Sequence, residues 1–275
     1  MRGWLVCGVL WVTGLVCSAQ SPGLPDLEEG TGLGAYSRSH FTLLSTRTNL
    51  AAMSCLKNPS LGFYGERQYL LGELNQFILL AGIPSGPGSF GLNFLFSGFS
   101  GYQETNLGLI YARSLGNKID AGSRLSYHRK KLSGGYGRVF SMQADFGLRL
   151  HFSESLVAGI QFFNPARGLN RKRKPETTPF ACTFGLGFEP SPKFYGSLEI
   201  KKAEGQPAHV IGAIRYSFIP ALAVQGGFST AQASGWVGAD LKISDFRVGL
   251  ITRFHPSLGM TPGIMLLYEF KRGEK

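Results

Sequence analysis

The 275-residue sequence lacks several features, and each absence excludes a class of protein. No apolar run of about 18 residues follows residue 20, so a transmembrane helix is not expected. Charged residues make up only 16% of the chain, whereas soluble domains have roughly 25%. Intrinsic disorder is also excluded, because 43% of the residues are hydrophobic and can be buried. Cysteine (4) and histidine (5) are scarce and lack metal-ligand spacing, so neither a metal nor a cofactor is expected.

Residues 1–19 have the pattern of a secretory signal peptide. A positive charge near the start precedes an apolar stretch over residues 4–16, and small residues suited to cleavage follow. A lipoprotein acylated at Cys17 is the less favoured alternative, because no small residue directly precedes this cysteine. Cys55 and Cys182 remain after cleavage. We expect them to behave as small hydrophobic side chains rather than as a disulfide, since they lie in distant segments.

The chain is rich in glycine (38) and phenylalanine (21), which occur in runs of alternating character. From Ser60 onward, runs of about ten residues alternate apolar and polar side chains between turn signals, which is typical of half-buried strands. Fourteen such runs can be counted, and the clearest covers residues 138–152. Residues 20–57 differ: they begin turn-rich and acidic, and residues 45–56 could form a short helix.

The polar faces of these runs carry too many charges for a dry protein core. Burying each ion would cost several kcal/mol, whereas polar faces that line a wet or ion-paired lumen, with apolar faces toward lipid, avoid that cost. Strands of about ten residues also match a tilted membrane crossing, while a soluble sandwich, the alternative, has shorter ones. Tight connections alternate with longer polar ones, including residues 97–105 and 255–261. The side chains predicted to face the lumen are Arg124, Asp145, Arg149, Arg215, Asp240 and Arg247.

The sequence therefore predicts an all-β protein, an antiparallel transmembrane β-barrel of about fourteen strands with a short N-terminal hatch segment. The expected location is the bacterial outer membrane, with tight turns on the periplasmic side and longer loops outside the cell. The expected state is a monomer. The predicted parts are a signal peptide over residues 1–19, a periplasmic or hatch segment over 20–57, the barrel over 58–271 and a C-terminal tail over 272–275.

The junction before the first strand reads Asn58-Pro59-Ser60. At this point the chain resembles the FadL-type superfamily of outer-membrane proteins, in particular the smaller Bacteroidota members related to PorV and PorQ, which have Asn-Pro-Ala there. The resemblance spans roughly residues 31–271. It implies a fourteen-stranded barrel whose lumen is filled by an N-terminal hatch. The chain departs from the family because it ends in a basic segment instead of on an aromatic residue. The resemblance therefore implies that Phe270, rather than the last residue, is the assembly signal.

The resemblance implies two alternative functions. The first is FadL-like passive transport of hydrophobic or amphipathic small molecules. The second is a non-transporting accessory role in type IX protein secretion or envelope assembly, with secretion-system proteins as partners. An enzyme is not expected: Ser126 and His128 share a face beside Ser141 and Asp145, but a polar lumen produces such coincidences by chance.

Positive charge concentrates in two predicted external loops of a chain with 28 Lys and Arg against 17 Asp and Glu. The first contains Arg129, Lys130, Lys131 and Arg138. A basic rim could hold outer-membrane lipid or anionic lipopolysaccharide head groups by charge attraction, and a solvated loop is the alternative. Nucleic acid is excluded, because these residues follow an export signal. The second loop contains Arg167, Arg171, Lys172, Arg173 and Lys174.

The mixture of acids and bases on the polar faces predicts a lumen joined by ion pairs and plugged by the hatch, with an open channel as the alternative. A passage for an apolar ligand would then need a gap between strands. Four strand glycines are places where such a gap could open: Gly108, Gly147, Gly159 and Gly212.

Overall fold

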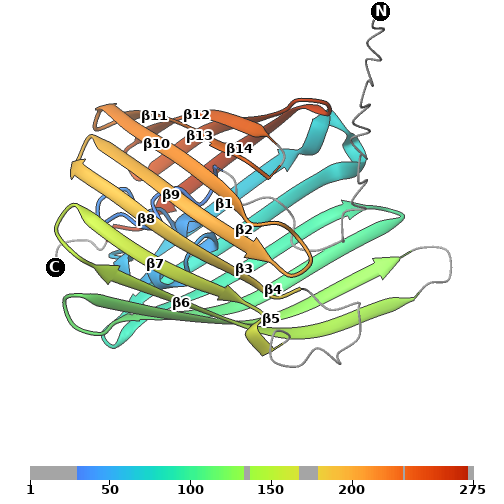
Figure 1. The fold of residues 1–275 in the computed structure, drawn as a ribbon, viewed down its shortest axis with the longest axis horizontal. Helices are drawn as coiled ribbons and strands as arrows, with labels where there is room; N and C mark the ends of the chain where they lie inside the picture. Colours follow the sequence, from blue (N-terminus) through green and yellow to red (C-terminus); the bar gives the residue numbers. More distant parts are fainter. Residues whose placement is uncertain (1–29, 133–136, 167–178, 232, 272–275) are drawn as a thin grey trace, which may run out of the picture.

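Fourteen antiparallel strands close into a barrel (Figure 1). The computed structural model describes residues 30–132, 137–166, 179–231 and 233–271. Within this part of the chain, no helix has the length and apolar character to cross a membrane. The predicted antiparallel barrel of fourteen strands is confirmed. The strands are β1 (Ser60–Arg67), β2 (Asn75–Ser85), β3 (Gly88–Phe99), β4 (Tyr102–Ser114), β5 (Ile119–Leu132), β6 (Arg138–His151), β7 (Leu156–Phe163), β8 (Ala181–Ser191), β9 (Phe194–Ala203), β10 (His209–Ile219), β11 (Leu222–Ser229), β12 (Ser234–Ile243), β13 (Phe246–His255) and β14 (Gly259–Glu269).

Each strand pairs with the next in sequence, and the first pairs with the last. Ser60 at the start of β1 lies opposite Gly82 of β2 on one side and opposite Glu269 of β14 on the other. Closure leaves no open sheet edge at this seam, as a sheet surrounded by lipid requires.

The two ends of the barrel differ in their connections. At one end the turns after the even-numbered strands have two to four residues, and β1 begins and β14 ends there. We call this the short-turn end, and the opposite one the long-loop end. Two connections predicted to be long are short, because β3 and β4 pair as far as Phe99 and Tyr102 and β13 and β14 as far as His255 and Gly259. The prediction was wrong there because these strands continue in polar residues, which resemble a loop in the sequence.

Side chains alternate between the outer surface and the lumen along the strands. On β6 the exposed fraction is 64% for Met142 and 50% for Phe146, but 0% for Asp145 and Arg149. Large apolar side chains are likewise exposed on the outside of the other strands. An apolar outer band around a polar interior is the arrangement of a barrel in a membrane.

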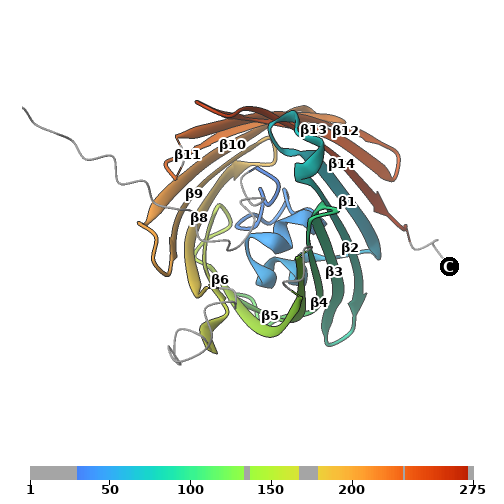
Figure 2. The same cartoon turned by 90° about the vertical axis from the view of Figure 1, so that its right-hand side faces the viewer.

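Residues 30–57 form the hatch, which lies inside the barrel (Figure 2). It contains two 3-10 helices, η1 (Leu43–Arg47) and η2 (Leu50–Cys55), instead of the one helix predicted over residues 45–56. Asn49 interrupts the helix: its side-chain oxygen accepts from the Ala51 amide at 3.0 Å, and its side-chain nitrogen donates to the carbonyl oxygen of Leu148 in β6 at 3.1 Å. The contact with the barrel wall competes with helix continuation.

Apolar side chains join the hatch to the wall formed by β14, β1 and β2. Leu43 and Met53 of the hatch belong to one buried cluster with Leu80 of β2 and Met265 of β14. The inner face of the barrel is therefore apolar in this sector, although most of its remaining circumference is polar.

Glycines on the inner face give the hatch its room. A Cβ atom at Gly185 of β8 would lie 2.1 Å from ring atoms of Tyr36, and one at Gly187 would lie 2.2 Å from the Tyr36 carbonyl oxygen. A Cβ at Gly122 of β5 would lie 2.5 Å from the backbone of Leu50. These positions accept no side chain while the hatch is in place.

The four glycines predicted to mark a gap between strands do not do so. Gly147 and Gly159 lie within the paired region of β6 and β7, and both face the hatch residue Asn49. Gly108 and Gly212 also lie in paired strands. The strand register keeps the ladder intact at all four positions, so this prediction was wrong.

Candidate functional site

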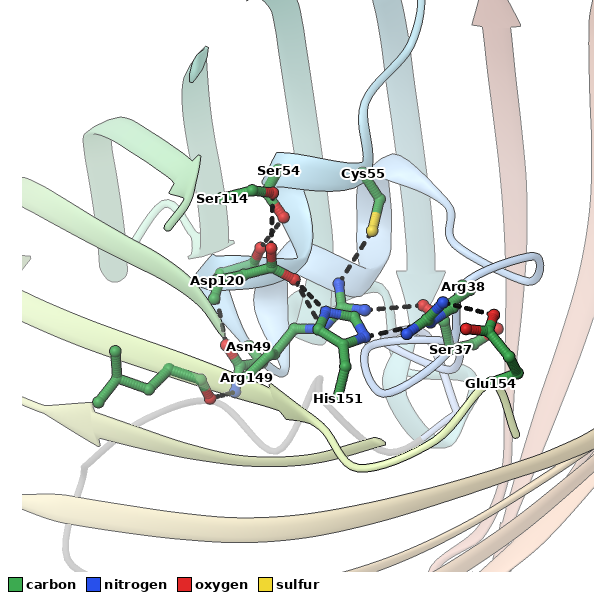
Figure 3. A network of polar contacts seen from close by, with 12 residues as sticks. Ser37, Arg38, Asn49, Ser54, Cys55, Ser114, Asp120, Arg149, His151 and Glu154 are labelled. Carbon is green, nitrogen blue, oxygen red and sulfur yellow. Dashed lines mark hydrogen bonds and ion pairs between the residues drawn. The ribbon is translucent and has the colours of Figure 1, made fainter. Parts of the chain in front are cut away.

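Arg149 holds the hatch to the wall near the short-turn end (Figure 3). Its side chain is fully buried; Nη1 donates to Cys55 Sγ at 3.1 Å and Nη2 donates to the carbonyl oxygen of Ser37 at 2.9 Å. Its Nε lies 3.8 Å from Asp120 Oδ2. One charged side chain of β6 therefore contacts both ends of the hatch and a carboxylate of β5.

Asp120 extends this network toward the mouth of the barrel. Ser114 Oγ donates to it at 2.6 Å, and His151 Nε2 lies 2.7 Å away. The other ring nitrogen of His151 accepts from Arg38 Nε at 3.2 Å, and Arg38 Nη1 donates to Glu154 at 2.6 Å (Figure 3). We call these connected contacts, from Arg149 to Glu154, the latch.

Glu189 of β8 provides a second attachment for the same hatch segment. Its carboxylate accepts from Ser37 Oγ at 2.5 Å and from the backbone amide of Arg38 at 3.0 Å, and it also accepts from Ser39 Oγ. An ionised acceptor with several donors makes hydrogen bonds stronger than neutral ones.

Arg124 and Asp145 form a buried ion pair on adjacent strands. Arg124 Nε and Nη2 lie 2.9 and 2.7 Å from Asp145 Oδ2. The other carboxylate oxygen accepts from Gln143 Nε2 at 2.5 Å and from the backbone amide of Asn164 at 2.9 Å. Asp145 is thus surrounded by donors, as a buried carboxylate requires.

Arg215, Asp240 and Arg247 form a second charged group across the lumen. Arg215 binds Asp240 through two nitrogens at 2.5 and 2.8 Å and also donates to Gln225 at 3.1 Å. Arg247 Nε lies 3.7 Å from the same carboxylate. All six side chains predicted to face the lumen therefore lie inside the barrel, in three ion-paired groups.

A polar cavity of about 40 Å³ lies between the hatch and β3 to β6, toward the long-loop end. His128 meets the amide nitrogen of Asn106 at 2.7 Å, and Lys130 forms an ion pair with Glu104 at 2.7 Å. Within the described chain, one carboxylate and three cationic side chains at inward positions line the cavity, and Arg129, at an outward position of β5, borders it. Its lining residues are Arg47, Asn93, Leu95, Glu104, Thr105, Asn106, Arg124, His128, Arg129, Lys130 and Gln143.

Within the described chain, two buried acceptors at this cavity have no hydrogen-bond donor. They are Asn93 Oδ1 and Gln143 Oε1, and both side chains are almost completely buried. A buried polar atom without a partner is costly, so the cavity favours a polar occupant that completes these bonds.

The junction motif lies between the hatch and β1. Ser60 Oγ donates to the carbonyl oxygen of Asn58 at 2.9 Å, and the carbonyl oxygen of Pro59 accepts from the amide of Phe270 at 2.9 Å. The motif thus joins the start of the barrel to its last strand. It does not contact the cavity lining described above.

Other predicted residues have different positions. Arg129, Lys130, Lys131 and Arg138 lie on β5 and β6 rather than in a loop, because the hairpin continues beyond the apolar band. Both Cys55 and Cys182 are free. The signal peptide over residues 1–19 and the tail over residues 272–275 lie outside the described residues, as does the predicted basic loop with Arg167, Arg171, Lys172, Arg173 and Lys174.

Sequence reasoning missed the hatch side of the site. Tyr36, Arg38, Arg47 and Asn49 occur in a segment without alternation, so no pattern marked them. The available signal was on the wall: glycines such as Gly185, at positions where the polar face should carry a side chain, imply that something else fills that space.

The strand residues Ser126, His128 and Asp145, which resembled a hydrolase site in the sequence, have separate surroundings in the structure. Ser126 Oγ is buried without a hydrogen-bond partner, His128 contacts Asn106, and Asp145 binds Arg124. Within the described chain, no group of three or more His, Cys, Asp or Glu side chains could hold a metal ion.

Comparisons by sequence found no matching family model and no matching curated protein. Comparison of the fold found outer-membrane transporters. The barrel of the CymD monoaromatic hydrocarbon channel is similar with a TM-score of 0.65 at 10% identity, covering 88% of this chain and 96% of that one. The toluene transporter TbuX of Ralstonia pickettii gives 0.62 at 10% identity, covering 84% and 94%. A Pseudomonas aeruginosa FadL homologue gives 0.59 at 10% identity, covering 88% and 98%.

The fold is a closed fourteen-strand barrel similar to those of FadL-type outer-membrane proteins. The closed barrel and its similarity to outer-membrane proteins support the predicted location in the bacterial outer membrane. We assign the short-turn end to the periplasm, because outer-membrane barrels have short periplasmic turns and longer extracellular loops. The similar structures named above are a channel, a transporter and a FadL homologue.

Proposed function

We propose that the protein is a FadL-like passive transporter of amphipathic small molecules that carry a small anionic head group. The observation that carries this proposal is the polar cavity, whose lining has three cationic side chains at inward positions and one carboxylate. A volume of about 40 Å³ suits a head group such as a carboxylate and leaves an apolar tail outside it.

The character of the lining separates this proposal from hydrocarbon transport. The names of the similar proteins CymD, TbuX and TodX refer to monoaromatic hydrocarbons or toluene. A hydrocarbon would leave the acceptors Asn93 Oδ1 and Gln143 Oε1 without donors, and it would add no partner for the cations. An anionic head group would pair with the cations, and water bound beside it would donate hydrogen bonds to the two acceptors.

Arg47 connects the cavity to the hatch. It is the last residue of η1 and it lines the cavity together with Arg124 of β5. A head group in the cavity would therefore touch the hatch directly, and its binding energy could favour a different hatch position. Movement of the hatch is needed for passage, because the latch and Glu189 hold it across the periplasmic half of the lumen.

The test compares binding of dodecanoate and dodecanol to the detergent-purified protein by calorimetry, followed by dodecanoate uptake into proteoliposomes. Arg47→Gln should weaken dodecanoate binding about tenfold and leave dodecanol unchanged, since one charge-assisted hydrogen bond is worth about 1.5–3 kcal/mol. Arg113→Gln, an exposed arginine of β4 that is part of neither the cavity lining nor the latch, should leave dodecanoate affinity unchanged. Equal binding of both ligands by Arg47→Gln and the wild type would reject the head-group site.

The second candidate is the accessory role in type IX secretion or envelope assembly, based on a relation to PorV and PorQ. The filled lumen and the hatch attachments favour it, because an accessory barrel needs no passage. Purification from native membranes separates the two functions: a secretion-system protein or cargo domain should copurify with an accessory barrel, and bound amphipathic lipid with a transporter.

A further inference from the structure

Three cationic side chains share the outward face of the barrel at the extracellular end of β5 and β6. Arg129 and Lys131 follow Leu125 and Tyr127 on the lipid-facing side of β5, where both of the latter are exposed. Arg138 of β6 lies directly opposite Lys131. We call Arg129, Lys131 and Arg138 the outer cation patch.

The outer cation patch lies directly beyond an aromatic pair. Arg129 is opposite Phe140 of β6, and the ring of Phe140 stacks on that of Tyr127 with centroids 5.9 Å apart. Exposed aromatic side chains near strand ends mark the level of the membrane interface. The patch therefore lies at the height of the outer-leaflet head groups.

Carboxylates are absent from this outward surface. On the described residues of β4, β5 and β6 the acidic side chains are Glu104, Asp120 and Asp145, and all three face the lumen or its cavity. Lys130, which lies between two patch residues, points inward and pairs with Glu104 at 2.7 Å. Within the described chain, none of the three patch residues forms an ion pair, so their charge faces the membrane surface uncompensated.

The neighbours on β4 are also suited to an anion. Thr105 lies opposite Arg129, and Gln103 lies opposite Lys131. Both side chains can donate hydrogen bonds without adding negative charge. Three cations with two neutral donors on adjacent strands match a phosphate group, which accepts several charge-assisted hydrogen bonds at once.

We propose that the outer cation patch binds a phosphate of lipopolysaccharide, the phosphorylated glycolipid of the outer leaflet. The acyl chains lie along the apolar faces of β5 and β6, and the phosphate lies between Arg129, Lys131 and Arg138. This site lies on the outer face of the barrel, whereas the head-group cavity lies in the lumen. Arg129 also borders the cavity, so the double variant Lys131→Gln/Arg138→Gln, which keeps Arg129, separates the two sites.

The test measures retention of lipid A by the full-length protein in mild detergent, using native mass spectrometry. The variant Arg129→Gln/Lys131→Gln/Arg138→Gln should lose apparent affinity by about tenfold or more, since each cation near an anionic surface contributes appreciably. A control variant removes the same charge from the periplasmic end: Arg113→Gln/Lys118→Gln/Lys193→Gln. These residues are all exposed, and the control should retain lipid A as the wild type does.

Three outcomes would overturn the proposal. They are undiminished retention by the patch variant, equal loss in the control variant, and equal retention of lipid A from which the phosphates have been removed. Heat-dependent gel mobility of each variant shows that the barrel is folded. Dodecanoate binding in the lumen, measured in parallel, separates failure of this site from failure of the proposed transport function.

Discussion

The lumen has two halves that are filled in different ways. In the periplasmic half the hatch occupies the space, with Tyr36 against Gly185 and Gly187 and with Leu43 in an apolar cluster. In the extracellular half the wall itself fills the space with long charged side chains such as Arg124, and a cavity of about 40 Å³ remains. Hatch packing and the polar attachments of the hatch therefore hold one half closed, whereas side chains of the wall alone shape the other.

The same strands build both halves. The inner face of β6 carries Gln143 and Asp145 beside the cavity and then Gly147 and Arg149 beside the hatch. A strand thus changes from long side chains to small ones where the hatch begins. The difference implies that an added methyl group should damage the periplasmic half more than the extracellular half.

The largest effect is expected for Asp145→Ala. This change leaves the buried Arg124 without its carboxylate, and breaking a buried pair on one side costs about 3–5 kcal/mol. The urea concentration at which the folded barrel loses its gel mobility should fall accordingly. Asp245→Ala, which removes a partly exposed pair with Lys271, should leave stability almost unchanged. Similar stabilities of the two variants would mean that ion pairs do not support the extracellular half.

The next-largest effect is expected for a glycine-to-alanine substitution, which we compare between the two halves. In Gly185→Ala the new Cβ would lie 2.1 Å from the fully buried ring of Tyr36, so the hatch must move. Overpacking of this kind costs about 1–3 kcal/mol. A loss of about 1.4 kcal/mol in hatch docking raises the undocked population tenfold, so the variant should show open-channel current in planar bilayers at least about ten times as often as the wild type.

Gly108→Ala is the counterpart in the extracellular half. Its new Cβ would meet side-chain atoms of Arg124 and Ser126 at 3.0 Å, and flexible side chains can move by a few tenths of an ångström. We expect its current to match that of the wild type. Equal currents in both glycine variants would show that docking of the hatch does not depend on the space left by Gly185.

The wall could be predicted from the sequence, because alternation is local information. The strand count and the inward direction of residues such as Arg215 and Asp240 follow from period-two patterns. The pairing of these charges could not be predicted, because Arg215 meets Asp240 across an intervening strand, β11, and the relative strand shifts are not encoded locally.

The hatch could be predicted only as a segment. Its path depends on contacts with residues about 100 to 150 positions away, such as Asn49 with Leu148 and Ser37 with Glu189. Short 3-10 helices with little regular patterning leave no periodic signal. The outer cation patch was mistaken for a loop for a related reason: a strand that leaves the apolar band becomes polar on both faces, although its pairing continues.

A smaller effect is expected at the exposed end of the latch. Arg38→Ala removes the pair with Glu154, which is 91% exposed, and the hydrogen bond to His151. Surface pairs contribute at most about 1 kcal/mol, so hatch docking should weaken slightly, seen as modestly faster proteolysis of the hatch. Glu154→Gln should reproduce most of this change. If hatch docking weakened as much as in Gly185→Ala, the main support of the hatch would lie at the mouth of the barrel rather than at Gly185.

The smallest effect is a pH dependence of the periplasmic half through His40 of the hatch. Burial lowers the pKa of His40 below its usual value of about 6.5; the nearby Arg215 and Arg247 act in the same direction, and Glu189 and Asp240 oppose them. The docked hatch therefore favours the neutral ring. Its full stability is present above about pH 6.5 and decreases as the pH falls through that value, because protonation then favours the undocked state. Bilayer current should rise slightly from pH 8 to pH 5 in the wild type and less in His40→Asn, and an identical rise in both proteins would assign the pH response to another group.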